Sequence, residues 1–87
     1  AWRLPLHEAY REYLASDVAD MANSASNPFA GACVAGLFLD RFVGEGIDWV
    51  HFDTFAWSPA PKPGRARGGR GLGLRAAWHA IQARYAD

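Results

Sequence analysis

Apolar and polar residues follow a helical rhythm in the first part of the chain. Over 5–15 the apolar side chains recur at i, i+3 and i+4 spacing, while Glu8, Arg11 and Glu12 fall on the opposite face. This pattern predicts a first helix, with Pro5 in its first turn. The next residues, 18–23, alternate apolar and polar positions, which predicts a short strand.

A second helix is predicted from Asn27 to about Val43. Asn27 suits the N-cap and Pro28 the first helical position, and Gly44 suits the end. The segment is apolar on almost every side, so we expect it to be buried on more than one side.

The residues 46–57 form the most informative stretch, because they are mostly aromatic, β-branched or otherwise apolar. They predict a buried strand over 48–55 that delivers its last residues to a site. The proline- and glycine-rich segment 58–71 then predicts a loop without regular structure. The last helix is expected over 72–86, with an apolar stripe of Leu74, Trp78, Ile81 and Tyr85.

The order helix, strand, helix, strand, helix predicts an α/β fold, namely a helix-rich slice of a layered sandwich with about three helices and two short strands. Two short strands make a poor sheet alone, so further chain or a partner edge is expected. With 87 residues, 1–87 form one domain at most. The chain opens on Ala1 and Trp2 without an initiator methionine, which we interpret as a fragment.

Composition and charge narrow the class of protein. Hydrophobic residues make up 51% of the chain and aromatic residues 14%. This is more aromatic surface than a small isolated domain hides easily. The net charge of zero argues against general attraction to nucleic acid or anionic membrane. The longest apolar run, 28–39, is too short for a membrane span. A single cysteine excludes an internal disulfide and fits a reducing cytoplasm.

Several residues are candidates for chemistry. His51 and Asp53 lie two apart on the expected strand and share a face, so they could bind a metal or act as an acid–base couple. The favoured interpretation is a buried hydrogen-bonded pair that fixes the strand end. We expect His7 and His79 to be surface residues and Cys33 to be a core residue.

The segment 62–71 carries interleaved arginine and glycine. It does not follow a strand and has no acidic residue about 20 positions later, so the dinucleotide-binding fingerprint is absent. Binding of RNA or another anion through this segment stays an alternative, against the favoured interpretation of a solvated loop.

Five segments, in this order, resemble those of the leucyl (cytosol) aminopeptidase family: 2–6 (Trp-x-Leu-Pro), 16–20 (Ser-Asp-x-x-Asp), the apolar helix 31–43, 51–53 (His-x-Asp) and 71–75 (Gly-x-Gly-x-Arg). The resemblance implies a helix-rich C-terminal fragment of a three-layer sandwich, the catalytic domain of a metallo-aminopeptidase. It implies a cytoplasmic enzyme, typically a hexamer, that removes N-terminal residues from peptides with two divalent metal ions, Mn²⁺ or Zn²⁺.

The family's metal ligands come from segments such as Asn-Thr-Asp-Ala-Glu-Gly-Arg, which nothing here matches. We therefore assign no catalytic residue and no metal ligand to this chain, and expect the fragment to bind no metal and to be inactive alone. The resemblance places Thr54, Phe55 and Ala56 in the wall of the pocket for the substrate's first side chain. The rival hypotheses are the small RNA- or anion-binding module and a plain oligomerisation domain.

Overall fold

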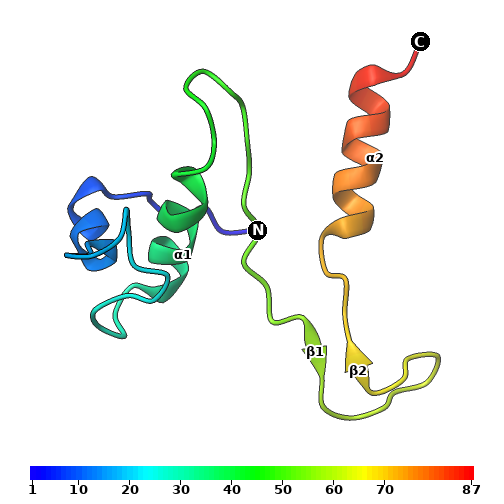
Figure 1. Ribbon diagram of the computed structural model, residues 1–87. Coiled ribbons are helices and arrows are strands. Elements are labelled where there is room, and N and C mark those ends of the chain that lie inside the picture. Colours follow the sequence, from blue (N-terminus) through cyan, green and yellow to red (C-terminus); the bar gives the residue numbers. More distant parts are fainter. The chain divides into compact units, whose positions relative to one another are not determined.

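A computed structural model describes all 87 residues. Figure 1 shows the elements in order: η1 (Glu8–Leu14), α1 (Gly31–Asp40), β1 (Trp57–Ser58), β2 (Gly68–Gly69) and α2 (Leu74–Tyr85). Three helices and a two-stranded sheet confirm the expected α/β fragment. The chain divides into two compact units, an N-terminal unit (Ala1–His51) and a C-terminal unit (Phe52–Asp87).

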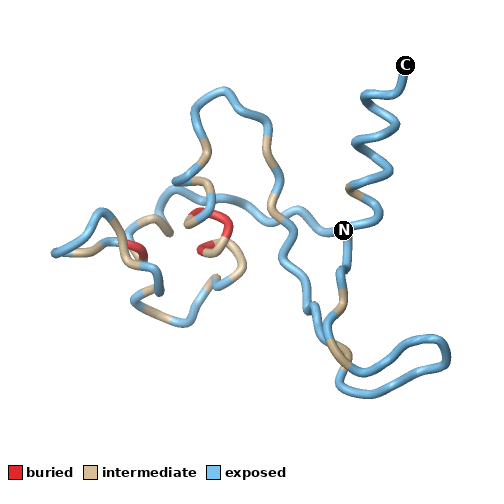
Figure 2. Tube along the Cα trace, turned by 45° about the vertical axis from the view of Figure 1, so that its right-hand side comes forward, coloured by how far each residue is buried: buried red, intermediate tan, exposed pale blue.

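The buried core lies in the N-terminal unit, where η1 packs against α1. Its buried hydrophobic side chains are Leu14, Val34 and Leu37, and only Leu37 is completely inaccessible to solvent. Figure 2 shows the buried positions in red, all of them in this unit. Tyr10, Tyr13, Ala25, Ala30 and Phe38 pack around these three residues. The core is small, so each of its members carries a large share of the stability.

The first helix is shorter and tighter than the sequence predicts. It is a 3₁₀-helix that begins at Glu8 rather than Pro5, and the N–H of Tyr10 donates to the carbonyl of His7 at 3.0 Å. His7 caps it, because the ring Nδ1 accepts a hydrogen bond from the N–H of Ala9 at 3.2 Å. His7 is exposed, as expected, and the structure adds this capping role.

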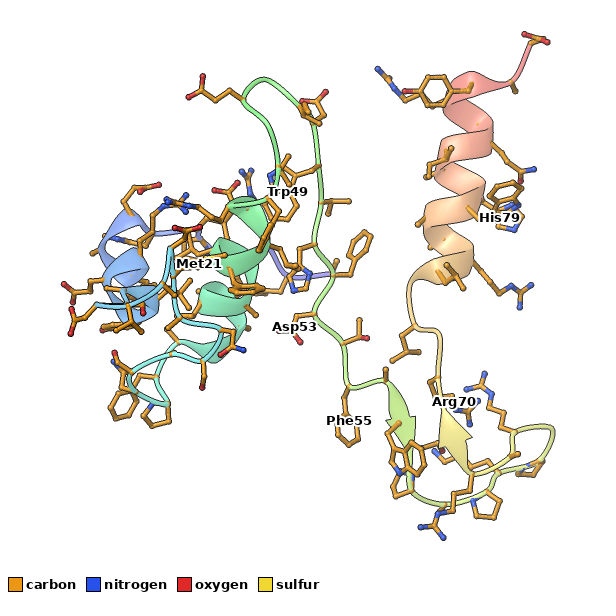
Figure 3. All side chains as sticks on the ribbon, in the orientation of Figure 1. Met21, Trp49, Asp53, Phe55, Arg70 and His79 are labelled. Atoms are coloured by element: carbon orange, nitrogen blue, oxygen red, sulfur yellow. The ribbon has the colours of Figure 1, made fainter.

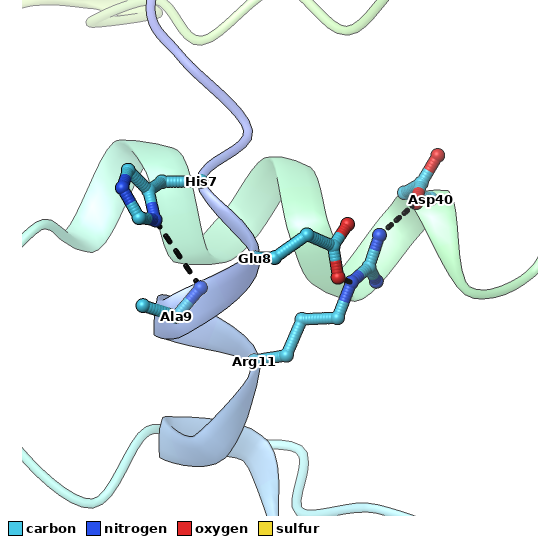
Figure 4. A network of polar contacts seen from close by, with 5 residues as sticks. All are labelled: His7, Glu8, Ala9, Arg11 and Asp40. Atoms are coloured by element: carbon cyan, nitrogen blue, oxygen red, sulfur yellow. Dashed lines mark hydrogen bonds and ion pairs between the residues drawn. The ribbon is translucent and has the colours of Figure 1, made fainter.

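A charged side chain ties η1 to α1. The guanidinium of Arg11 donates from Nε to Glu8 at 2.7 Å and from Nη2 to Asp40 at 2.6 Å (Figure 4). The hydrogen bonds to Glu8 and then Asp40 raise the pKa of Arg11 above its ordinary value. Arg11 therefore keeps its charge throughout the ordinary pH range, and the bridge joins the two helices across 29 positions of sequence.

The strand predicted over 18–23 is wrong, since these residues form a succession of bends. The hydroxyl of Ser16 accepts hydrogen bonds from the N–H groups of Val18 at 3.3 Å and Ala19 at 3.1 Å. Local side-chain acceptors of this kind compete with a strand for the backbone donors. Val18 is 97% exposed, so no burial favours the strand either.

The second helix begins at Gly31, later than predicted, and ends at Asp40 rather than Val43. Asn27 does not cap it. Its side-chain oxygen accepts from the N–H of Phe29 at 2.9 Å, which makes a local turn instead. Ala30 then takes a left-handed conformation, with φ of 52°, and becomes the N-cap. Asn27 is a residue type that often caps helices, but its side chain forms a local turn here, and the N-cap position falls to Ala30.

We expect Gly36→Ala to destabilise the N-terminal unit by about 0.5–1.5 kcal/mol. A Cβ at Gly36 would lie 2.8 Å from Cδ2 of Leu6, so the tip of that side chain must move. Gly31→Ala is the matched control in the same helix, because a Cβ there meets nothing within 4 Å. Chemical denaturation of both variants measures the difference. Equal free energies of unfolding for the two variants would show that Leu6 does not pack over Gly36.

The strand predicted over 48–55 is not formed in this chain. These residues belong to no sheet, and none of their backbone groups takes part in a hydrogen bond to another segment. A strand requires a neighbour that pairs with its N–H and C=O groups. The composition of the segment favours a strand, but the chain provides no partner for it.

The C-terminal unit contains a hairpin where the sequence predicts only an irregular loop. β1 and β2 pair antiparallel, with Trp57 opposite Gly69 and Ser58 opposite Gly68. At the far end Lys62 and Arg65 exchange two backbone hydrogen bonds, of 2.9 and 2.8 Å. Pro63 and Gly64, with φ of 71° at Gly64, occupy the two central turn positions between them, as in a type II turn.

The last helix agrees with the prediction to within two residues at its start and one at its end. The predicted stripe on α2 is present, but Leu74, Trp78, Ile81 and Tyr85 are each more than half exposed. No residue of α2 is buried. Isolated helices of this length are marginal in water, so the apolar face of α2 is expected to need a covering surface.

Candidate functional site

The expected pocket-wall residues Thr54, Phe55 and Ala56 lie in the C-terminal unit, directly before β1. All three are exposed, and the side chain of Phe55 is 78% accessible to solvent. Figure 3 labels Phe55 on the segment that leads into β1 and Arg70 at the end of β2. The three residues therefore present their side chains as part of an open surface.

The hairpin fixes one end of this segment. The N–H of Arg70 donates to the carbonyl of Ala56 at 2.8 Å, which extends the β1–β2 register by one further pair. The guanidinium of Arg70 also donates from Nη2 to the hydroxyl of Ser58 at 3.4 Å. Ala56 is thus held by the backbone of residue 70, while Thr54 and Phe55 have no such anchor.

His51 and Asp53 do not behave as the sequence predicts. The Nε2 atom of His51 is buried and has no hydrogen-bond partner. Its ring packs over α1, with Cδ2 3.9 Å from the position of a Cβ built on Gly36. Asp53 is exposed and makes no hydrogen bond or ion pair. Neither residue therefore meets the expectation of a hydrogen-bonded pair.

The other candidates have simpler surroundings. Cys33 is a free, half-buried thiol on α1, but it is not one of the buried core residues that the sequence analysis expected it to join. His79 is exposed on α2, as expected. No three His, Cys, Asp or Glu side chains of this chain gather into a set that could hold a metal ion.

Surface hollows lie elsewhere. The two clearest ones both border Leu14 in the N-terminal unit, and neither includes residues 54–56. Residues 54–56 border neither hollow, and their role in a pocket wall stays a prediction. No helix of the chain combines the length and apolar character needed to cross a membrane.

The class of protein follows from comparison with known sequences. The profile of the cytosol aminopeptidase family, catalytic domain, matches residues 1–77, almost the whole chain. The chain therefore belongs to the cytosol aminopeptidase family, a family of peptidases.

Individual relatives agree with this membership. A probable cytosol aminopeptidase of Rickettsia rickettsii is 42% identical over 77 residues, which cover 85% of this chain and 15% of the relative. Another, of Rickettsia canadensis, is 49% identical over 53 residues. The crystal structure of a cytosol aminopeptidase from Coxiella burnetii matches 97% of this chain with 51% identity and a TM-score of 0.81, and the match covers 18% of that protein.

The chain thus spans less than a fifth of the length of the relatives it matches. The suggested resemblance and the C-terminal catalytic-domain assignment are confirmed by these matches. The RNA-binding alternative receives no support, because the relatives are aminopeptidases and the Arg/Gly segment closes into a hairpin.

Proposed function

We propose that this chain works as one part of a two-metal aminopeptidase that hydrolyses N-terminal residues from peptides. The single observation that carries the proposal is the match of the catalytic-domain profile to residues 1–77. The 51% identity to a cytosol aminopeptidase of known structure supports the same conclusion. In this enzyme the chain contributes scaffold and one wall of the substrate pocket, and it has no activity alone.

The exposed apolar surface supports a scaffold role. Large apolar side chains are exposed in the C-terminal unit, including Phe55 and Trp57 before and within β1 and the stripe of α2. Large exposed apolar areas on a single chain mark surfaces that other polypeptide covers. We propose that the remainder of the enzyme covers them.

The metal chemistry is proposed to come from outside these residues. Two divalent ions, Mn²⁺ or Zn²⁺, would supply an activated water and polarise the scissile carbonyl when bound. The part assigned to this chain is to hold Thr54, Phe55 and Ala56 against the first side chain of the substrate. The hydrogen bond from the N–H of Arg70 to the carbonyl of Ala56 supports this assignment, because it restrains one end of the segment.

The remaining properties of the enzyme are proposals of the same kind. The names of the relatives, cytosol aminopeptidases, favour a cytoplasmic location. A homo-oligomer, a hexamer as the resemblance implies, would cover further apolar surface. No membrane and no nucleic acid are proposed as partners.

The test is metal removal from the full-length enzyme that contains these residues. We expect hydrolysis of leucine p-nitroanilide to fall to the buffer rate after dialysis against a chelator, and to return on addition of Mn²⁺ or Zn²⁺. Heat-inactivated enzyme with the same metal is the control. Full activity in the chelator-treated enzyme, with no metal detected by elemental analysis, would contradict the two-metal proposal.

A further inference from the structure

Arg70 differs from the other basic residues of the C-terminal unit. The others are exposed, and they are Lys62, Arg65, Arg67, Arg75 and Arg84. Arg70 is half-buried and lies at the end of β2, next to the proposed pocket wall. Among these cations it is the one that is half-buried and donates a side-chain hydrogen bond to another segment.

The strand register places this side chain on the same face as Ala56. Residues directly opposite in an antiparallel pair point to the same side, and so do positions i and i+2 along one strand. Ala56, Ser58 and Arg70 consequently share one face of the hairpin, and the bond between Arg70 and Ser58 agrees with this assignment. Trp57 belongs to the opposite face. The charge thus lies on the side of the wall that Ala56 presents.

The charge of Arg70 has no carboxylate partner in this chain. The two ion pairs of the structure both belong to Arg11. The single side-chain bond of Arg70 is the 3.4 Å contact with Ser58, which is at the long end of hydrogen-bond distances. A guanidinium has five N–H donors and pairs most strongly with a carboxylate in bidentate geometry. Within this chain the guanidinium therefore uses one of its five donors.

We infer that Arg70 selects substrates whose first residue carries a side-chain carboxylate. The inference rests on the proposed function, because it assigns a substrate class to the proposed pocket. Ser58, which holds the guanidinium, lies two residues beyond Ala56, or about 7 Å along the strand. Glutamate reaches further toward it than aspartate, so glutamate is favoured over aspartate among acidic first residues. The selectivity belongs to this hairpin and is separate from the metal chemistry.

The experiment compares three substrates with the full-length, metal-loaded enzyme: the p-nitroanilides of glutamate, glutamine and leucine. Glutamine has the shape of glutamate without the charge, so the ratio of their kcat/KM values isolates the carboxylate. We expect the ratio to favour glutamate by roughly 10- to 100-fold, the effect of one charge-assisted hydrogen-bonded pair. Arg70→Gln should lower this ratio to near one, because kcat/KM falls more for the glutamate substrate than for the glutamine and leucine substrates. Arg67→Gln, which alters an exposed arginine of the same segment, should keep the ratio.

The outcomes distinguish failure of the Arg70 inference from failure of the proposed function. If the wild type hydrolyses the leucine substrate but shows no preference for glutamate over glutamine, the inference is wrong and the proposed function stands. If Arg70→Gln lowers all three rates equally, Arg70 is structural and the inference is again wrong. Should this variant not fold, the wild-type ratio still decides, because it must decline as ionic strength rises. If no substrate is hydrolysed, the proposed function itself fails.

Discussion

Leu37→Ala is expected to unfold the N-terminal unit. Leu37 is the one completely buried side chain of the chain, and it packs with Leu14 and Val34 between η1 and α1. Truncation of a buried leucine to alanine costs about 2–5 kcal/mol, because transfer energy is lost and a cavity remains. A core of three buried residues has little stability in reserve, so a loss of this size removes most of it.

Leu39→Ala is the matched control, since it removes the same atoms from the same helix at a position that is 40% exposed. Its cost is expected to be below about 1.5 kcal/mol, in proportion to the smaller buried area. Amide hydrogen exchange in α1 of the 87-residue chain measures both effects. We expect protection to disappear in Leu37→Ala and to persist in Leu39→Ala. Equal loss in the two variants would show that the core is not centred on Leu37.

The spacing of apolar residues was sufficient to predict that the three helices exist. The stripe of Leu74, Trp78, Ile81 and Tyr85 predicts α2 correctly, because helical spacing depends on the helix itself. The ends were less accurate. Asn27 and Ser16 use their side chains to bind nearby backbone N–H groups, and these local bonds shift or replace the expected elements.

Strands depend on partners, which the sequence pattern does not specify. Residues 48–55 have the composition of a buried strand but find no neighbour in this chain. The hairpin, in contrast, has a weak strand composition, with two glycines in β2. The sequence feature that indicates the hairpin is the Pro63-Gly64 pair, because these residues suit the central positions of a type II turn. Recognition of that turn would have predicted the pairing.

The assignment of a pocket wall comes from the family resemblance, whereas the apolar run 46–57 indicates only a strand that ends at a site. Nothing in the composition of Thr54, Phe55 and Ala56 indicates a pocket, and their role as its wall stays a prediction. The role proposed for Arg70 could not be inferred from the sequence, because it depends on the register that brings residue 70 opposite residue 56. The segment 62–71 contains several arginines, and only the strand register shows that Arg70 is the one opposite Ala56.

The central proposal is that these residues form one part of an aminopeptidase and do not catalyse its reaction unaided. Their side chains form no metal-binding set, and the chain covers less than a fifth of its relatives. The second large effect we expect is therefore a complete difference between the 87-residue chain and the full-length enzyme that contains it.

Hydrolysis of leucine p-nitroanilide in the presence of Mn²⁺ or Zn²⁺, measured for both proteins at equal concentration, tests this claim most directly. We expect the full-length enzyme to be active and the 87-residue chain to give the same rate as metal alone. Metal-dependent hydrolysis by the 87-residue chain above that blank would contradict the account.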